Sequence, residues 1–394
     1  MEKNSNINSN ISTNASKNQS KYKVNEAGTL NVNNNIVIIK DNQKGIKIDN
    51  NHIDEILQKF KAIKDSEIIS FGRVLGEGAY GIVVEVLLNY SQKKFAAKLV
   101  SKTVDKTISA EEILEFRGFN IVKIISAFKL IHQNINYTLY LMEKSYLRDL
   151  FKLTEFYFRH NLLKLINITF IEITSDNLLR FYGNQIIYSI LNLEIYSYVH
   201  FDIKPDNLLV NNNLILKLCD FGLLTNIKSK HTIRIPGGTR GYITPEYYSG
   251  YELNQEDIKK QDYFGLGAIL YYLKFGAPLL EYEQHEKREW NENEIIEQLK
   301  VKMAYINSRP TLDKNLMEFI ILLINPYVKE RLNFERIYRN KWRIQNQNKI
   351  NLIMCIYEND EEKQIMELEK SDFLTNIVNK PKKRKKIGFR LNVS

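Results

Sequence analysis

The sequence has little of what marks secreted and membrane proteins. It contains only two cysteines, Cys219 and Cys355, which cannot form a disulfide framework, so a reducing compartment is expected. The densest apolar run, residues 319–324, is far shorter than the roughly 18 residues that a membrane-spanning helix needs. Residues 1–30 are polar and lack the apolar core of a signal peptide. We therefore expect an intracellular protein, cytoplasmic, nuclear or both, without a transmembrane segment.

A broad excess of positive charge is also missing. The net charge is +10, but residues 380–394 alone hold seven Lys and Arg side chains and no acid, so residues 1–379 carry only about +3. A nearly balanced body does not indicate nucleic-acid binding. With 394 residues, of which 44% are hydrophobic, the chain is long enough for two or three domains with a buried core.

The N-terminal part has few apolar residues. Residues 1–35 contain eleven Asn and five Ser, too little apolar surface to offset the entropy of ordering. We predict a disordered or extended region over residues 1–48, with short strands at 36–39 and 46–48. An amphipathic helix is predicted over residues 49–66, and it docks either on the following domain or on a partner. Its apolar stripe is formed by Ile53, Ile56, Leu57, Phe60 and Ile63.

The pattern then changes from strands to helices. Strand-like apolar runs cover residues 68–75, 81–88, 94–100 and 137–142. From residue 145 onward the apolar spacing is mostly helical, with a long amphipathic stretch at 176–198. A strand-rich part followed by a helix-rich part predicts an α+β protein with two lobes and a cleft between them.

A glycine-rich stretch lies between two of the predicted strands. Leu75-Gly-Glu-Gly-Ala-Tyr-Gly-Ile-Val83 has the pattern GxGxxGxV, in which glycines let the backbone approach phosphate groups. A dinucleotide-binding fold uses the same spacing but needs a helix after the third glycine. Residues 82–86 here predict a strand, which favours a hairpin that covers a nucleotide. Lys98 follows on the next strand, where its ammonium group is suited to hold phosphates.

Four polar residues lie close together about a hundred residues further on. Asp202, Lys204, Asn207 and Asp220 occur in His200-Phe-Asp-Ile-Lys-Pro-Asp-Asn207 and Asp-Phe-Gly222. Their carboxylate and amide oxygens suit a hard cation such as Mg²⁺, whereas no cluster of His and Cys indicates zinc.

Together these motifs resemble the eukaryotic protein kinase family over about residues 67–343, of the Ser/Thr type because of Lys204. The resemblance implies a small antiparallel-sheet lobe at 67–143 and a larger helical lobe at 146–343, with ATP and Mg²⁺ as cofactors. It makes Asp202, Lys204 and Lys98 catalytic, and Asn207 and Asp220 ligands of the metal. The residues expected around the nucleotide are Leu75, Gly76, Glu77, Gly78, Ala79, Tyr80, Gly81, Ile82, Val83, Ala96, Lys98, Glu143, Ser145 and Leu209.

The resemblance extends to positions that hold the helical lobe together. Gly238 to Glu246 is similar to the end of the family's activation segment, with Thr244 in place of an alanine. By this likeness Glu246 forms a buried ion pair with Arg331. Asp262 matches the aspartate that steadies the catalytic loop, His200 is a buried histidine bonded to backbone, and the Thr239 hydroxyl contacts Asp202.

Two departures from the family pattern stand out. Phe201 replaces the arginine that usually precedes the catalytic aspartate and pairs with a phosphorylated activation segment. We therefore expect activity without phosphorylation of that segment. The glutamate that pairs with Lys98 in the family is not fixed by the alignment, and Glu111, Glu112 and Glu115 all remain candidates.

The C-terminal part has no counterpart in the resemblance. Residues 344–379 predict a helical extension, and residues 380–394 form a basic tail. Lys382–Lys386 resembles a nuclear-import signal that binds an import receptor, although such a run also suits nucleic acid, acidic lipid or simple solvation. The sequence as a whole predicts a kinase that transfers the γ-phosphoryl group of ATP to Ser and Thr of a protein substrate. The alternative is a pseudokinase that binds ATP and acts as a scaffold.

Overall fold

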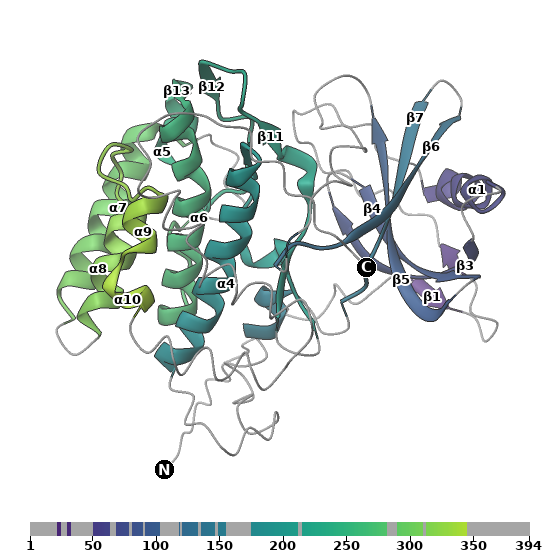
Figure 1. Ribbon diagram of the computed structural model, residues 1–394, viewed down its shortest axis with the longest axis horizontal. Helices are drawn as coiled ribbons and strands as arrows, with labels where there is room; N and C mark the ends of the chain where they lie inside the picture. The colour runs from purple at the N-terminus through teal and green to yellow at the C-terminus, as the bar shows by residue number, and fades with distance from the viewer. Residues whose placement is uncertain are drawn as a thin grey trace, which may run out of the picture. The chain divides into compact units, whose positions relative to one another are not determined.

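The computed structural model describes residues 22–24, 30–32, 50–63, 68–78, 81–89, 91–102, 118, 120–132, 135–145, 149–154, 175–211, 215–281, 290–309 and 313–344. The chain divides into two compact units, drawn in Figure 1. The small unit consists of residues 1–104 and 125–144, and the large unit of residues 105–124 and 145–394.

The small unit is built on one antiparallel sheet. Its strands are β3 (Ile68–Gly78), β4 (Gly81–Leu88), β5 (Ser91–Lys102), β6 (Ile124–His132) and β7 (Ile135–Met142), in the order β3-β4-β5-β7-β6. The four strand-like runs of the sequence correspond to β3, β4, β5 and β7. The strand β6 was not among them, because polar and apolar residues mix along it and most of its side chains are only partly buried.

The two faces of this sheet carry different residues, because side chains alternate along each strand. Paired positions place Val84 with Ala97 and Ala97 with Leu141 on one face. On this face the helix α1 (Asn50–Lys61) packs its apolar stripe against the strands (Figure 1), so the helix belongs to the core of the small unit rather than to a partner. From α1 the core includes Ile53, Ile56, Leu57 and Phe60, all less than 9% exposed.

Two short strands lie near the N-terminus. Tyr22–Val24 (β1) and Leu30–Val32 (β2) form an antiparallel pair inside the region that is predicted to be disordered or extended. Each strand has a polar residue between two apolar ones and ends in a β-branched valine, which permits such a pairing, but the high Asn content obscures it in the sequence. The strands predicted at 36–39 and 46–48 lie outside the described residues.

The large unit is mainly helical. Its helices are α4 (Ser175–Ile195), α5 (Pro245–Ser249), α6 (Gln255–Phe275), α7 (Glu292–Asn307), α8 (Lys314–Leu323), α9 (Phe334–Tyr338) and α10 (Lys341–Ile344). The helix α6 is central and buried on nearly every side, beside α4 and α8 in Figure 1. The Asn254 side chain caps its first turn, and Gly276 ends it with a left-handed φ of 68°.

Short strands and single turns connect these helices. The strands are β8 (Tyr198–Val199), β9 (Leu208–Val210), β10 (Leu216–Leu218), β11 (Thr225–Asn226), β12 (Thr232–Arg234) and β13 (Glu252–Asn254), with turns η3 (Pro205–Asn207) and η4 (Phe221–Leu223). They pair as β9 with β10, β8 with β11, and β12 with β13. The candidate catalytic residues lie on these connections.

An antiparallel sheet followed by a helical unit confirms the predicted α+β class. In the part of the chain that the structure describes, no helix combines the length and the apolar character needed to cross a bilayer. The helical extension predicted at 344–379 and the basic tail at 380–394 lie outside the described residues.

Candidate active site

The catalytic loop is fixed from below by one carboxylate of α6. Asp262 accepts hydrogen bonds from the backbone N–H groups of His200, at 2.7 Å, and Phe201, at 2.8 Å. Burial raises the pKa of Asp262 to about 7, although the two N–H donors oppose that shift. The sequence predicted this steadying role, and the structure confirms the contact.

His200 is a structural residue. Its Nδ1 accepts the backbone N–H of Asp202 at 3.2 Å, and its Nε2 lies 3.1 Å from the carbonyl oxygen of Cys219. This pairing requires the neutral tautomer with the proton on Nε2. Burial lowers the pKa of His200, against the nearby carboxylates of Asp202 and Asp220. The ring therefore links two backbone segments, as the sequence predicted, and is not poised as a general base.

The carboxylate of Asp202 is held by three polar side chains. Asn207 donates through Nδ2 to the Asp202 backbone oxygen at 2.8 Å and to Oδ2 at 2.9 Å. Lys204 Nζ lies 2.9 Å from the same Oδ2. Lys204 also donates to the Thr239 hydroxyl at 2.6 Å, and that hydroxyl donates to Asp202 Oδ1 at 2.6 Å. Both carboxylate oxygens thus have a fixed direction, which is what a residue that orients a substrate hydroxyl requires.

Asp220 has an unusual backbone conformation. Its φ of 61° and ψ of 78° lie in the left-handed region, which costs free energy for a residue other than glycine. Its side chain accepts the N–H of Gly222 at 3.2 Å. The preceding residue, Cys219, donates its N–H to the Asn207 carbonyl at 2.9 Å, which joins the two segments that carry the predicted metal ligands. The large unit therefore brings Asp202, Asn207 and Asp220 onto adjoining segments.

Phe201 occupies a buried apolar cluster. Its side chain is 1% exposed, and its backbone has a left-handed φ of 68°. The neighbours come mostly from the activation segment, residues 220–246. This cluster, called here the Phe201 cluster, consists of Val199, Phe201, Ile227, Ile233, Ile235, Ile243 and Ile258.

The glycine-rich hairpin lies at the turn between β3 and β4. Gly81 has φ of 144°, and a Cβ at this position would lie 2.0 Å from the Leu99 carbonyl oxygen, so only glycine fits. Gly76 pairs with Val83 and Glu77 with Ile82, which confirms the hairpin. Leu75 lies on β3 and is partly buried. Ala79 and Tyr80 lie outside the described residues.

Lys98 lies on the face of the sheet opposite α1. It pairs with Val83 on β4, and Ala96, two residues earlier, shares its face. Met142 pairs with Ala96 and so lies on this face as well. The predicted nucleotide-contacting residues of β4 and β5, apart from Ile82 on the α1 face, are therefore gathered on one surface of the small unit. The three candidate glutamates, Glu111, Glu112 and Glu115, lie outside the described residues.

The segment after β7 is held by an ion pair with Glu85, a residue that was not predicted from the sequence. Glu85 is 7% exposed, and its carboxylate forms ion pairs with Lys144 Nζ at 2.6 Å and with Lys94 Nζ at 2.8 Å. Burial alone would raise the pKa of Glu85, but the two lysines lower it below its usual range. This ion pair fixes the backbone next to Glu143, where the sequence predicts contact with adenine. The only advance signal was an acidic residue inside an apolar strand.

The remaining predicted nucleotide residues lie in the large unit. Ser145 donates its hydroxyl to the carbonyl oxygen of Val210. Leu209 lies between buried Leu208 and Val210 on β9 and is itself partly exposed.

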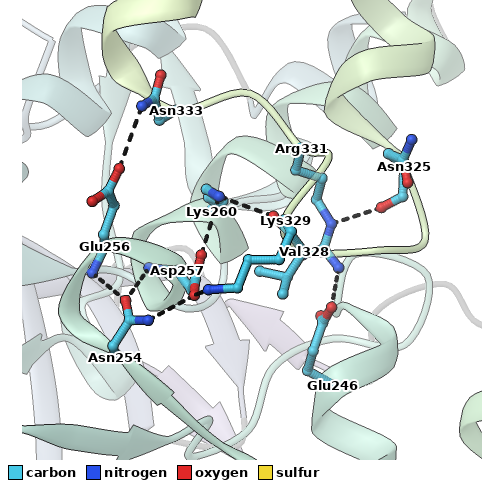
Figure 2. Close-up of polar contacts among 10 residues, drawn as sticks. All are labelled: Glu246, Asn254, Glu256, Asp257, Lys260, Asn325, Val328, Lys329, Arg331 and Asn333. Atoms are coloured by element: carbon cyan, nitrogen blue, oxygen red, sulfur yellow. Dashed lines mark hydrogen bonds and ion pairs between the residues drawn. The ribbon is translucent and has the colours of Figure 1, made fainter.

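A network of charges holds the end of the activation segment (Figure 2). Glu246 on α5 forms a buried ion pair with Arg331, which is 2% exposed, and this confirms the predicted pair. Arg331 also donates through Nε to the Asn325 carbonyl at 2.7 Å. Beside it, Asp257 contacts Lys329 and accepts from Lys260 at 3.1 Å (Figure 2). Because these contacts join α5, α6 and the loop before α9, they stabilise the large unit as a whole.

Comparison with known proteins agrees with this architecture. Residues 69–343, about 70% of the chain, match the protein kinase domain. The fold and the site thus define a class, the two-unit kinases with a glycine-rich hairpin and an Asp-Phe-Gly segment. The chain belongs to the protein kinase family.

Several curated relatives are similar at a distance. The chain is 27% identical over 232 residues to Extracellular signal-regulated kinase 1 of Candida albicans, covering 57% of this chain and 52% of the relative. It is 28% identical over 235 residues to Mitogen-activated protein kinase KSS1 of Saccharomyces cerevisiae, covering 57% and 61%. It is 28% identical over 222 residues to Serine/threonine-protein kinase MRCK beta of Rattus norvegicus, covering 54% and 12%. The chain therefore spans about half the length of the first relatives, and much less of the last.

Proposed function

We propose that this protein is an active Ser/Thr protein kinase that transfers the γ-phosphoryl group of ATP to Ser or Thr hydroxyls of a protein. The observation that carries the proposal is the bonded carboxylate of Asp202. In this role Asp202 accepts the proton of the substrate hydroxyl or orients it toward the phosphorus atom. Lys204, 2.9 Å from Asp202, balances negative charge on the transferred group.

The donor atoms of the large unit fit Mg²⁺ and the phosphates of ATP. Asn207 uses Nδ2 for its two bonds to Asp202, so its Oδ1 would serve as the oxygen ligand, and Asp220 would supply a carboxylate. Among the described residues no group of three or more His, Cys, Asp or Glu side chains is arranged around a metal ion. Two protein ligands, completed by phosphate oxygens and water, are what Mg²⁺ commonly has in kinases. The bound metal would neutralise charge on the phosphates.

The residues of the small unit fit a nucleotide. Gly76, Gly78 and Gly81 lie on or beside a hairpin that only glycine can form at its last position. Lys98 would hold phosphates as a point charge, and Val83 and Ala96 would contact the base from the same face. From the large unit, Leu209 would also contact the base. Glu143 and Ser145 would supply backbone groups for adenine.

The Phe201 cluster supports activity without phosphorylation of the activation segment. In many members of the family the arginine before the catalytic aspartate needs a phosphate partner, whereas the buried phenylalanine here needs none. The segment is instead ordered by apolar burial, strand pairing between β12 and β13, and the Thr239 bond to Asp202. This also weighs against the alternative, an ATP-binding pseudokinase scaffold, because Phe201 leaves the Asp202 contacts intact.

Phosphate transfer tests the proposal. Purified protein with ATP and Mg²⁺ should phosphorylate a Ser/Thr peptide library, and Asp202→Asn should lower the rate by about 100-fold or more with an unchanged melting temperature. ATP binding with no transfer by either protein would support the scaffold instead. Transfer to tyrosine peptides alone would contradict the Ser/Thr assignment.

The basic tail leads to a proposal on location. Lys382–Lys386, outside the described residues, would bind a nuclear-import receptor and add a nuclear pool to the cytoplasmic one. Deleting residues 381–386 from a fluorescent fusion should shift the protein toward the cytoplasm. An unchanged distribution would remove this proposal.

A further inference from the structure

The activation segment presents charge of one sign. Between Asp220 and Glu246 the sequence contains four Lys and Arg residues and one His, but no Asp or Glu. Lys228, Lys230, His231 and Arg234 are exposed. Among the described residues no ion pair involves any of these four. We call these four residues the basic face.

Contacts of the backbone hold the basic face in place and leave its charged side chains exposed to solvent. Along β12 the side chains alternate, so Ile233 is buried in the Phe201 cluster while Thr232 and Arg234 point to solvent. The backbone of the preceding turn is fastened by Gln255, whose Nε2 donates to the carbonyl oxygens of Lys228, at 3.3 Å, and Lys230, at 2.7 Å. The basic side chains therefore start from a fixed backbone, unlike those of a solvated loop.

One acid does lie near this surface. Glu252 on β13 is the cross-strand partner of Arg234, and its carboxylate accepts the Thr232 hydroxyl at 2.5 Å. Glu252 offsets one positive charge, and the other Lys and Arg side chains leave the activation segment itself positive. The surplus charge favours an anionic partner.

The same segment reaches the position of the phosphate acceptor. Thr239 bonds to Asp202, and Arg240 follows it with its guanidinium 5.9 Å from the centre of the Trp290 ring. Arg234 lies five residues before Thr239, so their Cα atoms are at most about 18 Å apart. A bound peptide that places its hydroxyl at Asp202 can therefore reach Arg234, the nearest residue of the basic face in sequence, within about five residues of the acceptor.

We infer that the basic face selects protein substrates with Asp or Glu close to the phosphorylated Ser or Thr. This inference rests on the proposed kinase function and adds the substrate class to it. Lys228, Lys230 and Arg234 act as specificity determinants, and Gln255 is a positioning residue that holds the backbone of the first two.

A positional peptide library around a central Ser provides the test. The wild type should prefer Asp or Glu over Asn or Gln by about tenfold at one or more flanking positions, which is the size expected of three exposed charge contacts. In the variant Lys228→Gln/Lys230→Gln/Arg234→Gln this ratio should fall to about one. The matched control Lys314→Gln/Arg336→Gln/Lys341→Gln removes three exposed charges elsewhere in the large unit and should keep the wild-type ratio. No acidic preference, or an equal loss in both variants, would overturn the inference.

A binding measurement separates failure of this inference from failure of the proposed function. Fluorescence anisotropy of a labelled acidic peptide, against the same peptide with Asn and Gln in place of Asp and Glu, needs no phosphate transfer. The acidic peptide should bind about tenfold tighter to the wild type and to Asp202→Asn, and the advantage should disappear in the Lys228/Lys230/Arg234 variant. Equal binding of both peptides to the wild type would overturn the inference even if the protein proved to be a kinase.

Discussion

The catalytic loop and the activation segment touch one another, yet different forces hold them. The loop around Asp202 is fixed by directional polar bonds from Asp262, Asn207, Lys204 and Thr239. The activation segment is fixed mainly by burial of isoleucines around Phe201. Polar bonds set the position of individual atoms, which catalysis needs, whereas apolar burial has little directional preference and holds a segment in place. Burial around Phe201 can therefore order the activation segment without a phosphate group.

The largest expected effect comes from removing the charge beneath the loop. Asp262→Asn replaces one carboxylate oxygen by an amide that cannot accept the N–H of His200 or Phe201, so the loop should shift. We expect phosphate transfer to fall by about 100-fold. Steady-state rates measure the loss, with the exposed first-turn residue of α6 changed as control, Glu256→Gln. Full activity in Asp262→Asn would show that the loop does not depend on these bonds.

The end of the activation segment should show the largest loss of stability. Arg331→Ala leaves the Glu246 carboxylate buried without its partner, at a cost of about 3–5 kcal/mol in the free energy of unfolding. Denaturant unfolding measures the change. Arg339→Ala breaks an exposed pair with Glu335, 3.3 Å apart, and should cost less than about 0.5 kcal/mol. Similar losses in both variants would contradict the assigned role of the buried pair.

The role of apolar burial in holding the activation segment can be tested at Phe201. Phe201→Ala should lower the free energy of unfolding by about 3 kcal/mol and release the activation segment. Trypsin should then cleave faster after Lys228 and Lys230, which are already exposed. Tyr251→Ala removes a side chain that is 64% exposed and serves as the control. An unchanged cleavage rate in Phe201→Ala would mean that polar contacts alone hold the segment.

A smaller effect should appear in the pH dependence of stability. Burial lowers the pKa of His200 below its usual 6.5, so below about pH 6.5 the unfolded chain takes up a proton that the folded chain does not. His200 therefore contributes a loss of stability as the pH drops through 6.5, of up to about 1.4 kcal/mol per pH unit, whereas Asp262, whose pKa burial raises to about 7, contributes a gain of similar size below pH 7. The two contributions nearly cancel in the wild type, so His200→Asn, which keeps only that of Asp262, should gain stability as the pH drops from 7 to 5.5, whereas His231→Asn, at an exposed position, should behave like the wild type. Equal slopes in the wild type and His200→Asn would contradict the buried neutral ring.

Structural features that depend on short sequence spacing or on likeness to the family could be predicted from the sequence. The glycines of the hairpin, the order of Asp202, Asn207 and Asp220, and the Glu246–Arg331 pair all lie in recognisable patterns. The alternation of β4 and β5 also follows from the residues themselves.

Other contacts join residues that are far apart in the sequence, and no motif in the sequence indicates that these residues lie close together in the fold. The bonds from Gln255 to the backbone of Lys228 and Lys230 and the ion pairs of Glu85 with Lys94 and Lys144 are of this kind. The same holds for Phe201. The sequence shows that it replaces an arginine, but only the fold shows that it packs with isoleucines of the activation segment.

The rate of phosphate transfer by protein that carries no phosphate tests the central claim most directly. Phosphatase-treated wild type and the variant Ser229→Ala/Thr232→Ala should phosphorylate a Ser peptide within about twofold of the untreated protein, because the Phe201 cluster already orders the segment. Thr239 is excluded from the variant because its hydroxyl bonds to Asp202. A loss of activity of about tenfold or more in both preparations, restored by rephosphorylation of the treated wild type, would contradict the account.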